Sequence, residues 1–82
     1  MPNVTVRFFA RYAELAGRES LALVVPPAAT VADVLARVRR EIPDAAVLPD
    51  RPLTALNLRQ VKLDARVQDG DELALLPPLS GG

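Results

Sequence analysis

The residues best suited to chemistry in this chain are its last three, Ser80, Gly81 and Gly82. Glycine has no side chain to bury and loses more backbone freedom on ordering than any other residue, so a terminal glycine pair contributes little to packing. The pair instead forms a slim peptide whose α-carboxylate can enter a narrow channel in another protein. We therefore interpret the C-terminal carbonyl of Gly82 as the reactive group of the chain.

The residue types that are absent exclude most other catalytic machinery. The 82 residues include no cysteine and no histidine, which excludes Ser-His-Asp and Cys-His nucleophiles and metal sites built from thiolates or imidazoles. Ser80 therefore has no base in its own chain, and we do not expect catalysis by this polypeptide alone. Asp69, Asp71 and Glu72 lack the spacing of a calcium loop and follow ordinary turn chemistry, so we predict no metal site.

Charge and hydropathy narrow the possible partners. Ten basic and ten acidic side chains give a formal net charge of zero, and Arg7, Arg11 and Arg18 are scattered without a run of aromatic residues, so no nucleic-acid partner is predicted. No apolar run approaches the roughly 20 residues of a membrane span, and the N-terminus lacks a signal-peptide pattern. We expect a single small cytoplasmic domain with no membrane partner.

The elements that must position the tail begin with two strands. Val4, Val6 and Phe8 alternate with more polar residues, which predicts a half-buried strand. Residues 10–16 are alanine-rich and precede Gly17, a pattern typical of a short helix with a glycine C-cap. Residues 19–25 alternate again and predict the second strand.

The clearest local signal is that of a helix starting after Thr30. Thr30 is a good N-cap, and Asp33 lies three residues later, where it can complete a capping box. Pro43 is expected to end the helix. One apolar stripe at steps of three and four residues predicts the buried face: Val31, Val34, Leu35, Val38 and Ile42.

The second half of the chain carries weaker signals. Residues 43–52 are predicted to be an irregular connection, 53–58 a strand, and 61–67 a further short strand or turn region. A turn at 69–71 then leads into the last strand, 72–76. The order β-β-α-β-β predicts an α+β fold with a mixed sheet over the main helix. We expect one domain over 1–76 and an extended C-terminal tail over 77–82.

Three segments of the chain carry a family resemblance. The most specific is the run from 69 to 82: Asp-Gly-Asp-Glu, a strand, two prolines, an apolar residue, Ser and Gly-Gly. Together with Val-Arg-Phe-Phe-Ala at 6–10 and Ala-Leu-Asn at 55–57, it resembles the small, sulfur-carrying subunits of molybdopterin synthase, within the ubiquitin-like β-grasp sulfur carriers. Two positions depart from the family pattern. No glycine follows Asn57, so that hairpin can differ, and Leu75-Leu76 replaces aromatic residues that some members carry.

The resemblance implies a ubiquitin-like β-grasp fold, with a mixed β-sheet packed on one main helix and a flexible Gly-Gly tail. It also implies that an adenylating, E1-like enzyme uses ATP with Mg to activate the carboxylate of Gly82, and that a sulfur donor protein converts the adenylate to a thiocarboxylate. The large subunit of molybdopterin synthase would pass this sulfur to a cyclic pterin precursor in molybdenum cofactor biosynthesis, within a heterotetramer. The chain would thus be a subunit and sulfur-donating co-substrate that binds no cofactor itself.

The tail would reach the partner's active site but could not hold the complex alone. Its members are Pro77, Pro78, Leu79, Ser80, Gly81 and Gly82; the prolines favour an extended segment, and the six residues span about 20 Å. Ordering them costs about 6–12 kcal/mol, whereas burying Leu79 returns about 1.5–3 kcal/mol. We therefore predict an exposed apolar docking patch of Phe9, Leu76 and Leu79. Phe9 lies on the opposite strand face from Phe8, and its alternative place is beneath the short helix or the proline-rich loop.

Other functions stay open at this point. The same tail chemistry serves sulfur carriers for thiamine or tRNA thiolation. A ubiquitin-like protein modifier would instead join Gly82 to lysines of target proteins, and Lys62, the single lysine, leaves little scope for chains of the protein on itself. A β-grasp interaction module without tail chemistry is the remaining alternative.

Overall fold

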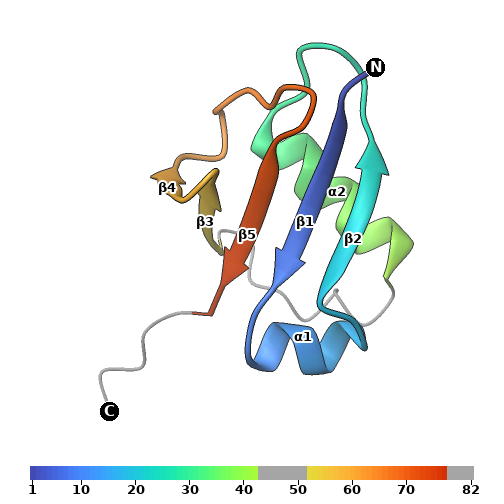
Figure 1. Ribbon diagram of the computed structural model, residues 1–82, viewed down its shortest axis with the longest axis vertical. Helices are drawn as coiled ribbons and strands as arrows, with labels where there is room; N and C mark the ends of the chain where they lie inside the picture. The colour runs from blue at the N-terminus through green and yellow to red at the C-terminus, as the bar shows by residue number, and fades with distance from the viewer. Residues whose placement is uncertain (43–51, 78–82) are drawn as a thin grey trace.

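The computed structural model describes residues 1–42 and 52–77, which form a five-stranded sheet and two helices (Figure 1). The strands are β1 (Asn3–Phe8), β2 (Ser20–Val24), β3 (Leu53–Leu56), β4 (Arg59–Val61) and β5 (Glu72–Leu76); the helices are α1 (Arg11–Ala16) and α2 (Val31–Glu41). Residues 78–82 of the predicted tail lie outside the described residues, so the division into 1–76 and 77–82 stays a prediction.

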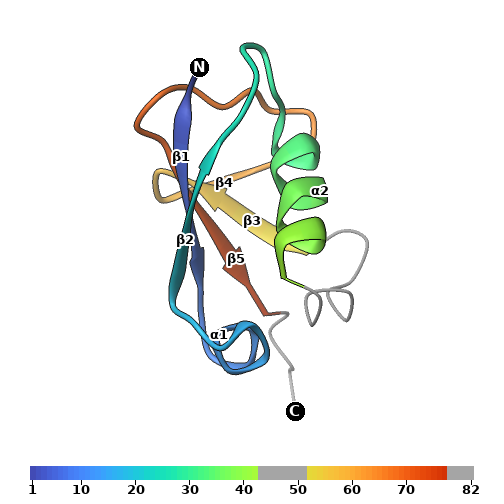
Figure 2. The same cartoon turned by 90° about the vertical axis from the view of Figure 1, so that its right-hand side faces the viewer.

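The sheet is mixed, with the strand order β2-β1-β5-β3-β4. β1 and β5 are parallel neighbours, with Val6 opposite Leu73, and the other three pairings are antiparallel. The last strand of the chain is therefore the central strand of the sheet. Figure 2 shows α2 against one face of the sheet, while no helix of the described residues covers the other face. These features confirm the predicted α+β class.

The core lies between the sheet and α2. β1 alternates between exposed and buried residues, and its inward side chains, Val4, Val6 and Phe8, are all buried. Leu73 and Leu75 of β5 are fully buried beside them. The apolar stripe of α2 packs onto this surface, and every member of the predicted stripe is buried: Val31, Val34, Leu35, Val38 and Ile42. The periodicity therefore identified the buried faces correctly.

Local capping explains where α2 begins and where α1 ends. The Thr30 backbone N–H donates to Asp33 Oδ2 at 2.9 Å, and the Asp33 backbone N–H donates to Thr30 Oγ1 at 3.3 Å, which completes the capping box of α2. α1 ends at Gly17, whose φ of 69° lies in the left-handed region that glycine adopts without strain. Both predicted caps are confirmed.

The predicted strand over 53–58 was wrong at its end. β3 stops at Leu56, and Asn57 and Leu58 form the turn to β4, a separate strand. Both turn residues have positive φ, 51° and 73°, as in a type I′ hairpin, where glycine usually takes the second position. Left-handed geometry costs a leucine about 1–2 kcal/mol, and Leu58 is 93% exposed. An apolar residue at this strained position continued the strand pattern in the sequence and concealed the turn.

Candidate functional site

The candidate site is the end of the sheet at which β5 stops and the predicted tail begins. β1 and β5 run in parallel, so both stop at this end, at the bottom of Figure 1. β5 ends at Leu76, and Pro77, half-buried, is the first residue of the predicted tail and the last described residue. Since β5 is central, the chain leaves the domain between its two neighbouring strands. The end of β1 and the start of β3 lie at this same end of the sheet.

Three apolar side chains surround this exit. Antiparallel pairing sets Leu53 opposite Leu76, and the parallel register, in which Phe8 lies opposite Leu75, brings Phe9 to the other side of Leu76. All three side chains belong to the face away from α2, because the residues next to them in sequence, such as Leu75 and Phe8, are buried. Leu53 is 38% exposed and Phe9 39%, and Leu76 is half-buried. We call Phe9, Leu53 and Leu76 the exit patch.

The backbone after β1 keeps Phe9 at the surface. Ala10 has φ 49° and ψ −123°, a strained combination for a residue other than glycine, and α1 starts immediately afterwards. On the sheet, the Arg7 guanidinium lies 5.6 Å from the centre of the Phe9 ring, within cation–π range, and 3.8 Å from the carboxylate of Glu72. The predicted exposure of Phe9 is thereby confirmed over burial beneath α1. Its role in docking stays a prediction.

Sequence reasoning placed Phe9 and Leu76 in one patch but missed Leu53 and Arg7. Leu53 joins the patch only through the antiparallel register of β3 and β5. A register of this kind depends on residues far apart in the sequence, and no local signal marked it. Leu79, the third predicted member, lies outside the described residues, as do Ser80, Gly81 and Gly82.

The opposite end of β5 is held by a polar network. Asn57 Nδ2 donates to Asp71 Oδ1 at 2.8 Å, and Asn57 Oδ1 accepts from the backbone N–H of Glu72 at 3.0 Å. Asp71 Oδ2 also accepts from the backbone N–H of Gln68 at 2.6 Å. The β3–β4 hairpin is therefore tied through Asn57 to the start of the central strand. Asp71 and Glu72 serve this structural arrangement.

Asp69 fastens the N-terminus to the same end. Its Oδ1 accepts from the backbone N–H of Asn3 at 2.8 Å and from Asn3 Nδ2 at 3.3 Å. Because these donors, the backbone N–H above all, favour the ionised form, they hold the pKa of Asp69 below its ordinary value of 3.8. Within residues 1–42 and 52–77, no group of three or more acidic, histidine or cysteine side chains is placed to hold a metal ion. In the same residues, no helix has the length and apolar character needed to cross a membrane.

Comparisons with known proteins agree with the fold and the resemblance. The molybdopterin synthase sulfur carrier subunit of Arabidopsis thaliana is 35% identical over 98% of this chain and 83% of its own length. The crystal structure of small archaeal modifier protein 1 from Haloferax volcanii superimposes with a TM-score of 0.85 at 29% identity, over 96% of this chain and all of that one. These matches confirm the predicted ubiquitin-like β-grasp fold.

A third match comes from an assembly. One chain of a complex between subunits 1 and 2 of the molybdopterin-converting factor from Helicobacter pylori superimposes with a TM-score of 0.70 at 25% identity, over 98% of this chain and 99% of that one. The model of the ThiS family matches residues 6–82, which include both the exit patch and the tail. On this match and the near-complete overlap with its relatives, the chain belongs to the ThiS family.

Proposed function

We propose that this chain is a sulfur carrier and the small subunit of a molybdopterin synthase. The observation that carries the proposal is the position of β5. It is the central strand of the sheet, and it ends beside the exit patch. If fully extended, six residues from Pro77 onward reach about 20 Å, a length that suits a deep active site. Membership of the ThiS family and the name of the Arabidopsis relative support the same function.

The chemistry follows from the terminal carboxylate of Gly82. A carboxylate is a poor electrophile at neutral pH, so an adenylating enzyme first attaches it to the α-phosphate of ATP, with Mg, and pyrophosphate leaves. A donor protein then supplies sulfur at the oxidation level of sulfide. The new C–S bond replaces the bond to AMP, and the product is a thiocarboxylate. Gly81 and Gly82 have no Cβ, so hydrogen-bond donors of each partner can approach the reacting carbon closely.

Transfer of this sulfur to a cyclic pterin precursor takes place in the large subunit, and hydrolysis returns the carboxylate of Gly82. The exit patch docks on the large subunit beside the entrance of the tail channel and offsets the entropy that the tail loses there. The two-subunit complex from Helicobacter pylori supports an assembly of this kind. We expect two carriers on a dimer of large subunits, in the cytoplasm.

Intact mass spectrometry of the protein isolated from its own host tests the proposal. A fraction with one oxygen replaced by sulfur, localised to Gly82 by fragmentation, is the expected result. Loss of that fraction in a host lacking the adenylating enzyme would connect it to the proposed route. Copurification of the large subunit, with sulfur transfer to the cyclic pterin, assigns the pathway. Sulfur transfer only to a thiamine precursor or to tRNA would instead assign the carrier to another route.

A protein modifier is the second candidate, favoured by the name of the Haloferax volcanii neighbour. A lysine amine of a target would attack the same acyl-adenylate, forming an amide and releasing AMP. The same mass spectrometry distinguishes the two functions, because a modifier leaves Gly82 attached to lysines of other proteins. Recovery of such conjugates, with no terminal thiocarboxylate, would overturn the sulfur-carrier proposal.

A further inference from the structure

A separate surface, the outer edge of β2, has backbone groups without a strand partner. The Phe8 N–H donates to the Glu19 carbonyl at 2.9 Å, and the Val25 N–H donates to the Pro2 carbonyl at 3.0 Å. In an antiparallel pair, the backbone groups of every second residue form hydrogen bonds with the neighbouring strand. The backbone N–H and C=O groups of Leu21 and Leu23 therefore also point toward β1. The residues between them direct their N–H and C=O groups away from the sheet: Ser20, Ala22 and Val24.

The two edges of the sheet differ in their protection. β4 has three residues, begins with Arg59, and by the same alternation directs only Gln60 outward. Short length and charged or polar side chains are the usual protection of an edge against added strands. β2 has five residues, Ser-Leu-Ala-Leu-Val, with neither a charge nor a proline, and Val24 is 47% exposed. The β2 edge is therefore the less protected of the two edges against an added strand.

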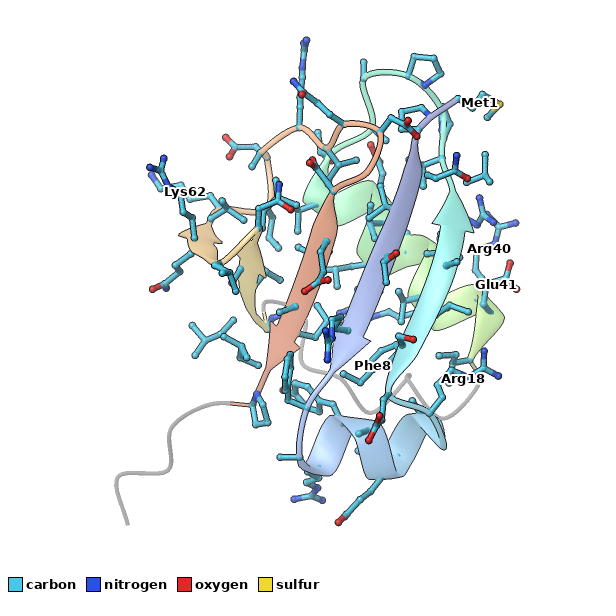
Figure 3. All side chains as sticks on the ribbon, viewed as in Figure 1. Met1, Phe8, Arg18, Arg40, Glu41 and Lys62 are labelled. Atoms are coloured by element: carbon cyan, nitrogen blue, oxygen red, sulfur yellow. The ribbon has the colours of Figure 1, made fainter. Side chains whose placement is uncertain are left out.

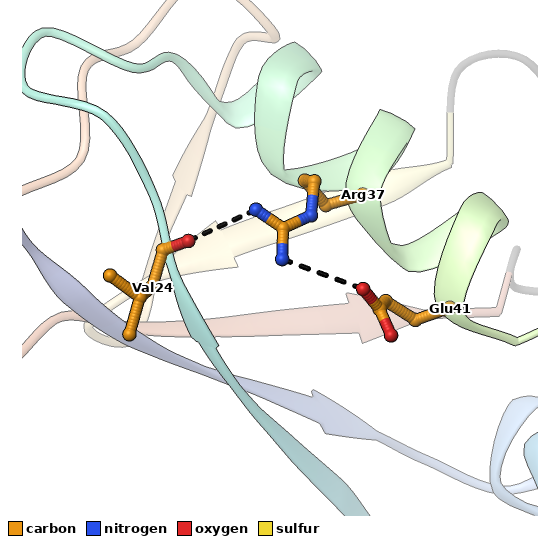
Figure 4. Close-up of polar contacts among 3 residues, drawn as sticks. All are labelled: Val24, Arg37 and Glu41. Carbon is orange, nitrogen blue, oxygen red and sulfur yellow. Dashed lines mark hydrogen bonds and ion pairs between the residues drawn. The ribbon is translucent and has the colours of Figure 1, made fainter.

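A side chain of α2 lies over one group of this edge. Arg37 Nη1 donates to the Val24 carbonyl at 3.0 Å, and Nη2 lies 3.5 Å from Glu41 Oε1 (Figure 4). The guanidinium thus holds the position that the N–H of a further strand would take. Among the described residues, no hydrogen bond is made by the backbone groups of Ala22 or by the Val24 N–H. An added strand could satisfy all of them.

Cationic side chains flank the space beside the edge. A hollow of about 430 Å³ lies next to it, lined by Pro26 and its neighbours in the β2–α2 connection and by Asp33, Ala36, Arg37 and Arg40 of α2. Figure 3 shows Arg40, Glu41 and Arg18 along the β2 side of the molecule. Arg40 is exposed. An acidic side chain entering this space would meet Arg37 and Arg40. The carboxylate of Asp33, which lines the same hollow, already accepts from the Thr30 backbone N–H in the capping box of α2.

We propose that the β2 edge binds an extended, acidic peptide segment of another protein as an additional antiparallel strand. Peptide residues opposite Ser20, Ala22 and Val24 point to the open face, and those between them point inward, where Arg37 and Arg40 lie. Charge complementarity therefore selects an acidic residue at an inward position. A pairing of β2 with β2 in a second copy is the competing occupant, and the dependence of amide protection on protein concentration distinguishes it from peptide binding.

A synthetic pentapeptide, acetyl-Thr-Glu-Val-Val-Thr-amide, tests the proposal. With its first threonine opposite Val24, its glutamate points inward toward Arg37, and the N–H of its central valine faces β2. We expect saturable binding with new protection of the Ala22 and Val24 amides in hydrogen exchange. N-methylation of the central valine should weaken binding about tenfold or more, because it removes a strand hydrogen bond and adds a clash. N-methylation of the next valine, whose N–H faces away, is the matched control and should change affinity less than about twofold.

Two protein variants complete the test. Arg40→Gln should weaken binding of the glutamate peptide about threefold or more but not that of its glutamine analogue. Ala22→Pro removes an outward N–H without breaking a bond to β1, and should abolish binding while sulfur loading of Gly82 is retained. Equal binding of the two N-methylated peptides, no saturation, or amide protection that rises with protein concentration alone would overturn the proposal. Each of those outcomes leaves the sulfur-carrier function intact.

Discussion

The two ends of β5 differ in chemical character: polar hydrogen bonds hold its start, and apolar side chains surround its end. At its start, Asn57 bridges Asp71 and Glu72, and the Asp69–Asn3 contacts fasten the N-terminus alongside. At its end, the strand reaches Leu76 among the half-exposed apolar side chains of Phe9 and Leu53. One end of the central strand is thus fixed by directional hydrogen bonds, and the other presents apolar surface and a chain exit.

This difference indicates that the start of β5 contributes mainly to the stability of the fold, and that its end contributes mainly to partner binding. Hydrogen bonds at the start of β5 fix its pairing register. A slip of one residue would move every side chain of the strand to the opposite face of the sheet. The exit patch contributes less to folding because about two-fifths of Phe9 and of Leu53 remains exposed to solvent. Changes at the exit should therefore affect partners and sulfur transfer, and changes at the start should affect the free energy of unfolding.

The largest expected effect is at the tail itself. Deletion of Gly82, or fusion of a tag after it, should abolish thiocarboxylate formation. Deletion leaves Gly81 as a terminal glycine that ends one residue short of the reacting position, and a tag removes the free glycine carboxylate. The melting temperature should change little, since the tail follows the last core strand. Intact mass spectrometry and thermal unfolding measure the two effects, and the same tag at the N-terminus is the control. Sulfur loading of a protein that still carries the C-terminal tag would contradict the assignment.

The next largest effect is expected from Asn57→Ala at the start of β5. The variant loses the hydrogen bonds to Asp71 and Glu72 and places alanine at a φ of 51°. The free energy of unfolding should fall by about 2–3 kcal/mol, as measured by urea denaturation. Asn57→Gly also loses the side-chain hydrogen bonds, but glycine adopts the positive φ without strain. Its free energy of unfolding should therefore lie between those of Asn57→Ala and the unchanged protein. Sulfur loading of the folded variants should stay normal. A loading defect without a loss of stability would show that the start of β5 also takes part in function.

A smaller effect is expected from Phe9→Ser in the exit patch. Binding to the large subunit, measured by calorimetry, should weaken about tenfold, because a partly exposed aromatic anchor is lost. Leu58→Ser makes a similar change at the far end of the sheet, on a more exposed side chain, and is the matched control. Equal loss of affinity in both variants would show that the exit patch is not the docking surface.

The smallest effect concerns pH and Asp69. Hydrogen bonds from Asn3 hold the pKa of this carboxyl below 3.8 in the folded state, so its charged form stabilises the fold above that pH. The contribution is lost as pH falls through the lower, folded pKa. The stability difference between the protein and Asp69→Asn should therefore be constant near neutral pH and shrink in acid below about pH 4. Urea denaturation across this range provides the measurement, and a difference that grows in acid would contradict the assignment.

Local signals were sufficient for the elements whose structure depends on neighbours in sequence. The capping box at Thr30 and Asp33 and the apolar stripe of α2 are short-range patterns, and both were predicted correctly. Local patterns missed the hairpin after Leu56, which only the family resemblance indicated, because its turn residues, Asn57 and Leu58, lack the glycine that usually marks positive φ. Its geometry is imposed by the pairing of β3 with β4 and by the bonds of Asn57 to β5, which no local pattern records.

The sequence by itself led to the prediction that the chemistry of this protein involves the carboxylate of Gly82 and partner proteins, because the 82 residues contain no histidine or cysteine. It also determined the buried faces, because periodicity is a local property. Only the tertiary structure decided that β5 lies at the centre, that Leu53 meets Leu76, and that β2 rather than β4 has an open edge. Those features depend on strand order and register, which arise from contacts between residues far apart in the chain.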